Sequence, residues 1–236
     1  MTRDERPLRA VPPAMWIALA ATLAAQIGWR SLQGPAGAGA ADLPPPPSAQ
    51  ALRLASFGEP PALARLAMLY LQAFDYGGAN LTPYRRLDYT RLIGWLDAIL
   101  ELDPRSEYPL FAAARIYAEV PDEARSRLML EFIYRQFFVD PDRRWPWLAH
   151  AALLAKHRLK DLPLARRYAA AIDRHTHAAS VPLWAKQMEI FILEDMNELQ
   201  AARILLGGLL ESGAIRDPAE ARFLRQRLEE LERRRR

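Results

Sequence analysis

The sequence predicts an all-α fold, and three observations support this prediction. Val, Ile and Thr, which favour strands, together number only 20 of the 236 residues. Ala, Leu, Arg and Glu, which favour helices, form long runs instead. Apolar residues also recur every three or four positions, as at Leu92, Leu96 and Ile99, and this spacing places them on one face of a helix.

The expected helices begin near residue 49 and are separated by residues that favour turns. Helices of about 12 to 17 residues fit between these breaks, and short connections favour antiparallel pairs. The breaks lie at Gly77-Gly78, Asp103-Pro104, Pro121, Asp140-Pro141, Val181-Pro182 and Gly213.

Residues 10–29 carry no formal charge and predict a single N-terminal transmembrane helix, so that residues 1–30 comprise a short cytoplasmic segment and a membrane anchor. About 20 apolar residues are enough to cross the hydrocarbon core of a bilayer. Trp16 and Trp29 lie near the two ends of the stretch, where aromatic rings favour the interface. A cleaved signal peptide and an amphipathic helix of a soluble protein stay open as alternatives.

The arginines on either side of this stretch predict its orientation. Arg3, Arg6 and Arg9 precede it, whereas Arg30 is the only basic residue after it until Arg53. Positive charge is retained in the cytoplasm. The sequence therefore predicts a single-pass protein of the inner (cell) membrane with a periplasmic C-terminal domain, with a cytoplasm-facing domain as the alternative.

Residues 31–50 predict a linker rich in Gly, Ala and Pro. The run Pro44 to Pro47 favours an extended polyproline II spacer with no internal hydrogen bonds. Beyond the linker we expect a helical domain at 51–232 and a separate arginine tail at 233–236.

The distribution of charge argues against a nucleic-acid partner. Residues 48–232 hold 24 Lys and Arg against 25 Asp and Glu, a net charge of −1. The excess of base lies largely in the tail, where arginines suit the negative end of a helix. The helical domain is therefore not a basic surface for phosphates.

The patterns that catalysis and metal binding require are missing from the sequence. There is no cysteine, so disulfides, thiolate metal sites and cysteine nucleophiles are excluded. Neither Gly77-Gly78 nor Gly207-Gly208 continues into a phosphate-binding loop with a lysine. We therefore expect no enzymatic activity, no cofactor, no metal and no small-molecule substrate.

Two pairs of identical residues at the same spacing indicate an internal repeat. Pro104 and Pro141 are 37 residues apart, and so are Trp147 and Trp184. A period in this range is typical of helical solenoids. With the stretch 88–104, DYTRLIGWLDAILELDP, these positions resemble degenerate tetratricopeptide repeats (TPR) over residues 88–211.

The resemblance implies a right-handed solenoid of helical hairpins across the domain at 51–232. The end of this domain has its own signal, because Asp217 is a good N-cap, Pro218 suits the first helical position, and Glu220 could return a hydrogen bond. These residues predict a capping helix over 217–232.

The resemblance also implies a binding site. In such solenoids the first helix of each hairpin lines a concave groove that holds a protein segment. Trp147 is expected in the core. The expected groove residues are Tyr108, Arg115, Trp145, Lys156 and Glu189.

The sequence thus favours a membrane-tethered adaptor or scaffold with a protein or peptide partner. By analogy with the family, the expected setting is the assembly of an envelope complex. The alternatives are a non-catalytic subunit or an enzyme of such a complex with an unrecognised site, and an adaptor that faces the cytoplasm.

Overall fold

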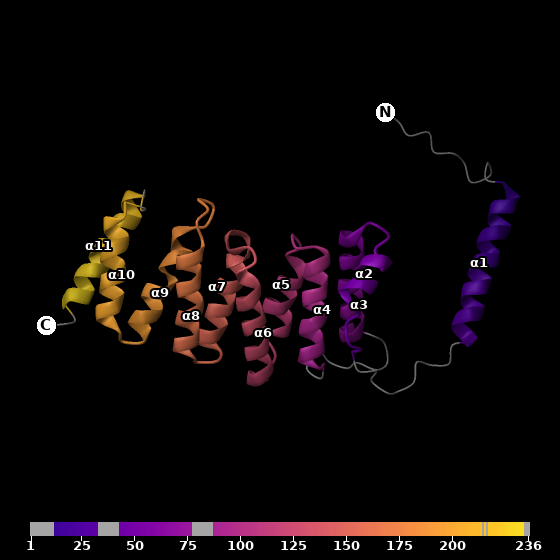
Figure 1. The fold of residues 1–236 in the computed structure, drawn as a ribbon, viewed down its shortest axis with the longest axis horizontal. Helices are drawn as coiled ribbons and strands as arrows, with labels where there is room; N and C mark the ends of the chain where they lie inside the picture. Colours follow the sequence, from indigo (N-terminus) through magenta and orange to yellow (C-terminus); the bar gives the residue numbers. More distant parts are fainter. Residues whose placement is uncertain (1–11, 33–42, 77–86, 214, 216, 234–236) are drawn as a thin grey trace, which may run out of the picture. The chain divides into compact units, whose positions relative to one another are not determined.

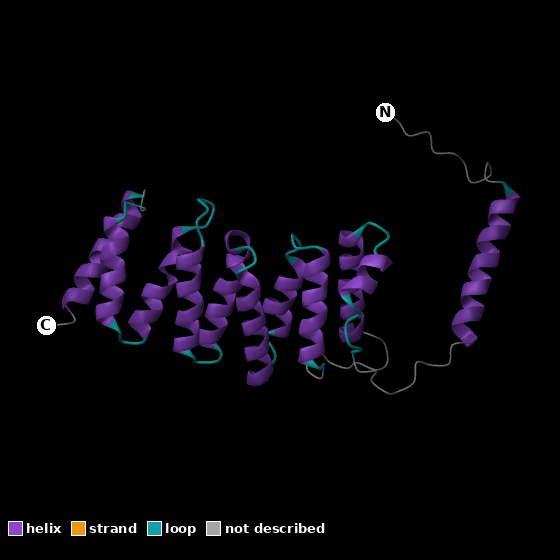
Figure 2. Ribbon diagram, viewed as in Figure 1, coloured by secondary structure: helices purple, strands orange, loops and turns teal. Residues whose placement is uncertain are grey.

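The computed structural model describes residues 12–32, 43–76, 87–213, 215 and 217–233. Helices form the regular structure of these residues, which contain no strand, so the all-α prediction is confirmed (Figure 2). Figure 1 labels the elements, which are α1 (Pro13–Leu32), α2 (Ala49–Ala55), α3 (Pro60–Tyr76), α4 (Tyr89–Leu102), α5 (Tyr108–Ala112), the π-helical segment η3 (Ala113–Tyr117), α6 (Glu123–Phe137), α7 (Pro141–His157), α8 (Leu162–His175), α9 (Leu183–Asp195), α10 (Leu199–Glu211) and α11 (Pro218–Arg233).

Helix α1 covers most of the predicted membrane segment and belongs to a different compact unit from α2 to α11. Among the described residues, no helix combines the length and the apolar character that crossing a membrane requires. The prediction of a transmembrane helix at 10–29 is therefore not supported. The physical reason is composition, because alanine is only weakly apolar and Thr22 and Gln26 interrupt the stretch.

From α2 to α11 the helices follow one another along a row (Figure 1). Each helix contacts the next one in the chain, and α4 also contacts α6 while η3 contacts α7. The helices α5/η3 and α6, α7 and α8, and α9 and α10 form successive hairpins.

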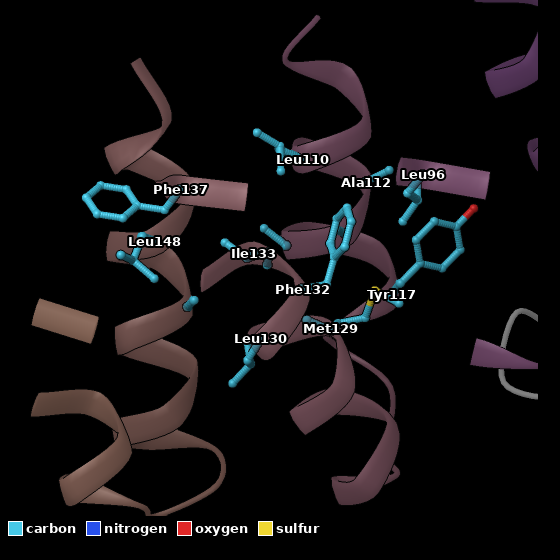
Figure 3. Close-up of a cluster of buried hydrophobic side chains, with 14 of the residues drawn as sticks. Leu96, Leu110, Ala112, Tyr117, Met129, Leu130, Phe132, Ile133, Phe137 and Leu148 are labelled. Carbon is cyan, nitrogen blue, oxygen red and sulfur yellow. The ribbon is translucent and has the colours of Figure 1, made fainter. Parts of the chain in front are cut away.

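Two clusters of buried side chains hold this row together. The larger cluster runs from Leu43 to Ile192, and Figure 3 shows its centre, where Tyr117 of η3 and Phe132 and Phe137 of α6 are almost completely buried. A smaller cluster joins α9 to α10 and α11. Helix α9 contributes to both clusters, with Ile192 on the first and Leu193 on the second.

A set of polar contacts joins residues that are 33 to 40 positions apart. This spacing corresponds to the 37-residue period of the sequence, so these contacts link each hairpin to the next one. The pairs are Gln72–Tyr108, Asp97–Arg135, Arg105–Arg143, Pro104–Arg144, Arg127–Asp161, Glu131–Arg167, Asp142–His177, Lys156–Asp195, Gln187–Glu220 and Glu194–Arg227.

Arg144 ties two of the Asp-Pro turns together. Its side chain is only 5% exposed and donates hydrogen bonds to the carbonyl oxygen of Pro104 at 3.0 Å and to that of Gln136 at 2.8 Å. The neighbouring Arg143 donates to the carbonyl oxygen of Arg105 at 2.9 Å. Burial lowers the pKa of Arg144, but a guanidinium stays charged at neutral pH. The cation is therefore stabilised by carbonyl dipoles.

Asp142 extends this arrangement to the following turn. Its Oδ1 atom accepts hydrogen bonds from the backbone N–H groups of His177 at 2.7 Å and Ala178 at 2.9 Å. These N–H groups, that of Ala178 first, hold the pKa of Asp142 below its ordinary value of 3.8. Three successive turns are thereby linked through Asp142 and Arg144.

The second half of the predicted linker is not a free spacer. Leu43 is 1% exposed and packs in the larger core cluster. The Trp95 Nε1 atom donates to the carbonyl oxygen of Pro44 at 2.8 Å, and Arg91 donates to that of Leu43 at 2.9 Å. Extended polyproline segments leave their carbonyl oxygens free, and α4 supplies donors for them. Residues 31, 32, 49 and 50 of the predicted linker are helical, and residues 33–42 lie outside the described part.

Helix α11 occupies the predicted position of the capping helix. Asp217 accepts a hydrogen bond from the backbone N–H two residues later at 2.8 Å, and Leu224 and Leu231 are buried in the smaller cluster. The Glu220 Oε1 atom accepts a hydrogen bond from Gln187 of α9 at 2.8 Å, so the glutamate joins the cap to its neighbour.

Replacing Arg144 with Met is expected to lower the free energy of unfolding by about 2–4 kcal/mol, because the hydrogen bonds of a buried guanidinium that join two turns are lost. Urea denaturation followed by far-UV circular dichroism measures this loss. Arg143→Met is the matched control, and we expect a loss of less than about 1 kcal/mol because its side chain is largely solvated. Equal losses in the two variants would contradict the role given to Arg144.

Replacing Asp142 with Asn is expected to lower stability at neutral pH but not in acid. Since folding depresses the pKa of Asp142, the stabilisation is complete above its ordinary value of 3.8 and disappears as the pH falls through the folded-state value. Denaturation at pH 7 and at pH 3 measures the gap between parent and variant. A gap of the same size at both pH values would show that the carboxylate charge contributes nothing.

Candidate partner-binding site

Helices α5 and α7 carry a row of aromatic rings on the surface. Tyr108 is 43% exposed and Phe111 is 38% exposed, and their rings stack with centroids 6.0 Å apart. The edge of Trp147 on α7 meets the ring of Phe111 at 5.9 Å. Residues three apart on a helix share one face, so packing of the opposite face of α5 in the core leaves Tyr108 and Phe111 at the surface.

A group of charged side chains continues this row. Arg115 lies one turn beyond Phe111, and its guanidinium approaches Glu119 at 3.9 Å. The Glu119 Oε1 atom in turn lies 3.4 Å from the Nε2 atom of His150 on α7. We call these residues together the first-helix face, defined by Tyr108, Phe111, Arg115, Glu119, Trp147 and His150.

Trp147 Nε1 is a buried nitrogen atom of this face that lacks a hydrogen-bond partner within the described part of the chain. His150, three residues later on α7, has the carboxylate of Glu119 3.4 Å from its Nε2 atom. Buried polar atoms are normally paired, because leaving one unpaired costs about 1–3 kcal/mol. The indole nitrogen of Trp147 therefore distinguishes this face from the satisfied core.

The electrostatic surroundings keep His150 neutral at pH 7. Burial lowers the pKa of His150, the nearby Arg115 guanidinium lowers it further, and Glu119 opposes both effects. A neutral imidazole has one donor and one acceptor nitrogen. The first-helix face therefore carries one full cation, Arg115, and one full anion, Glu119, beside uncharged aromatic rings.

The π-helical segment η3 sets the register of Arg115. The backbone N–H of Ala118 donates to the carbonyl oxygen of Ala113 at 2.8 Å, which is a five-residue step. Such a turn inserts one residue and rotates everything that follows it around the helix axis. Short π-helical turns of this kind occur frequently at functional sites.

The five residues that the sequence predicted for the groove are divided among different surroundings. Tyr108 and Arg115 lie together on the first-helix face. Trp145 is half-buried, packs on the larger core and meets the ring of Trp184 edge-on at 5.4 Å. The structure therefore does not leave Trp145 as an open platform.

Lys156 and Glu189 are both engaged in ion pairs within the fold. Lys156 pairs with Asp195 of α9, which links two hairpins. Glu189 is 4% exposed, pairs with Arg166 of α8 at 3.1 Å and lines a hollow beside α9 and α10.

The sequence analysis did not assign Phe111, Glu119, Trp147 or His150 to the site. A signal existed in α5, because Tyr108, Phe111 and Arg115 have the spacing of one helix face. Trp147 was expected in the core and is partly buried against it, but its indole nitrogen reaches no partner. The pairing of Glu119 with His150 depends on the contact between η3 and α7 and has no local signal.

Within the described residues, no group of three or more His, Asp or Glu side chains could hold a metal ion. The first-helix face combines exposed aromatic area with a cation and an anion, which are the features of protein recognition surfaces. Comparison with protein-family models, with curated proteins and with solved structures found no match to this chain.

The free energy of unfolding is expected to depend on pH, because the pKa of His150 is lower in the folded protein than in the unfolded chain. Because the folded-state pKa of His150 lies below its ordinary value of 6.5, stability is complete above that pH and falls as the pH drops from 7 to 5. Thermal denaturation at these two pH values measures the effect, and His150→Gln should reduce it. His157→Gln, at an exposed histidine on the same helix, is the matched control.

Proposed function

We propose that this protein is an adaptor whose helical hairpins stack as a right-handed, TPR-like solenoid and whose first-helix face binds a segment of a partner protein. The polar contacts between residues 33 to 40 positions apart support the stacking, because each hairpin of a solenoid contacts its neighbours. Assembly of an envelope complex, as the setting for this role, stays a prediction from the sequence.

The single observation that carries the proposal is the exposed aromatic row beside Arg115. Aromatic rings and arginine supply much of the binding energy at protein interfaces. The row lies on helices whose other faces are buried in the core, so the partner meets a preformed surface.

The same residues favour binding over catalysis. The first-helix face holds one imidazole, and its neighbours are the guanidinium of Arg115 and the carboxylate of Glu119. The face contains no serine, threonine or lysine that this imidazole could activate. We therefore propose recognition of a protein segment as the activity of this site.

Site-specific photo-crosslinking in cells tests the proposal. A photoreactive phenylalanine analogue at position 111 is expected to yield a discrete crosslinked product with one partner, which mass spectrometry then identifies. Adding Arg115→Ala should reduce the yield at least roughly tenfold, since loss of one interface anchor costs about 1–2 kcal/mol or more.

Position 223 is the matched control, because Phe223 is an exposed phenylalanine on α11 outside the first-helix face. The analogue at 223 should not yield the same product. Circular dichroism verifies that each variant keeps its helical content. The proposal is wrong if position 111 yields no discrete product, or if the product forms equally at 223 and survives Arg115→Ala.

A further inference from the structure

A second surface feature lies at the other end of the helix row, among α8, α9, α10 and the start of α11. It is a hollow of about 840 Å³, and its lining includes no residue of the first-helix face. Its apolar part comes from α9 and α10, through Ile190, Leu205 and Leu209. The hollow lies beside α9, which contributes side chains to both the larger and the smaller buried cluster.

Glycine forms part of the wall of this hollow. Gly208 lies inside α10, where glycine costs about 1 kcal/mol relative to alanine. A Cβ atom at Gly208 would meet no atom within 4 Å, so packing within the described chain does not require a glycine there. A missing side chain in an open helix wall allows another backbone or side chain to approach closely.

The apolar side chains around Gly208 are left uncovered. Ile204 is 62% exposed and Leu205 is 37% exposed, although both line the hollow. Together with Leu209 they form the apolar wall of the hollow on α10, whereas Ile190 of α9 lines the hollow but is buried in the smaller cluster. An apolar surface of this kind gains free energy when a partner removes it from water.

The rim of the hollow is acidic. Among the described residues, Asp173, Glu189, Asp217 and Glu220 line it beside Lys186 and His177. The Lys186 Nζ atom donates to the carbonyl oxygen of Thr176 at 3.0 Å. The four carboxylates outnumber Lys186 and His177, so the net charge of the described lining is negative.

The charged groups on the rim differ in how far they are neutralised. Glu189 pairs with Arg166, whereas Glu220 accepts a hydrogen bond from the neutral side chain of Gln187. Asp173 is exposed in the last turn of α8. Asp173 and Glu220 are thus placed to attract a cationic side chain.

We propose that this hollow binds a short amphipathic helix of a partner protein, with apolar side chains against α9 and α10 and a lysine or arginine at the acidic rim. The uncovered apolar wall and Gly208 explain why a helix could approach closely. The net negative rim explains why the occupant is basic rather than acidic. This site is separate from the first-helix face and does not depend on it.

Fluorescence anisotropy with a model peptide tests the proposal directly. The probe is a fluorescein-labelled amphipathic helix made of leucine and lysine, and its counterpart replaces every lysine with glutamate. We expect the full-length protein to bind the lysine peptide and to bind the glutamate peptide at least roughly tenfold more weakly, with affinity falling as salt is raised.

Two glycine substitutions distinguish the hollow from other surfaces. Gly208→Leu fills the hollow and should weaken binding of the lysine peptide roughly tenfold or more. Gly207→Leu is the matched control, because Gly207 has the same open surroundings and the same helix but does not line the hollow, and its affinity should change less than about twofold. Leucine favours helix over glycine, so neither variant should melt below the parent.

Asp173→Asn provides an independent variant that keeps the shape of the hollow and removes a charge, and it should weaken binding about threefold. Phe111→Ala should leave peptide binding unchanged, so failure of the proposed adaptor face and failure of this site are distinguishable. The proposal is overturned if Gly208→Leu binds like the parent, if both glycine variants lose binding equally, or if the glutamate peptide binds as well as the lysine peptide.

Discussion

The buried guanidinium of Arg144 must keep its hydrogen bonds, and this requirement holds neighbouring hairpins in one register. Its donors reach the carbonyl oxygens of Pro104 and Gln136, and these acceptors lie in the preceding turn and at the end of α6. Asp142, two residues earlier, accepts from the backbone of the following turn. Because a buried cation cannot be left unpaired without a large cost, the turns cannot shift relative to one another. The apolar core supplies the main stabilisation, and these hydrogen bonds select one arrangement of it.

The two candidate binding surfaces lie at two different places along the row of helices. At α5 and α7 the rings of Phe111 and Trp147 meet, so the surface there is preformed. At α9 the core divides into two clusters, and a hollow opens among α8, α9 and α10. Contact between rings of neighbouring hairpins thus provides the recognition face, whereas the division of the core provides the hollow.

The sequence predicted the helical elements well because their signals are local. The Asp103-Pro104 and Asp140-Pro141 turns separate helices as expected, and α11 follows its predicted N-cap. The candidate site was predicted less well. Glu189 was expected on an exposed groove, but Arg166 on α8 draws it into a buried ion pair, a contact across 23 residues that no spacing rule contains.

By itself, the sequence determined the all-α class and the turns at Asp103-Pro104, Asp140-Pro141 and Val181-Pro182, since helix propensity, capping and periodicity act over a few residues. The predicted break at Gly77-Gly78 lies outside the described residues. Only the tertiary structure decided which side chains meet. It packed the proline run 44–47 on α4, where Gly94 leaves just enough room for Pro46, and it formed the π turn that sets Arg115. It also left Trp147 Nε1 and the wall around Gly208 without a partner within the described chain. These outcomes depend on contacts between helices, which are fixed by the packing of the whole row rather than by neighbours along the chain.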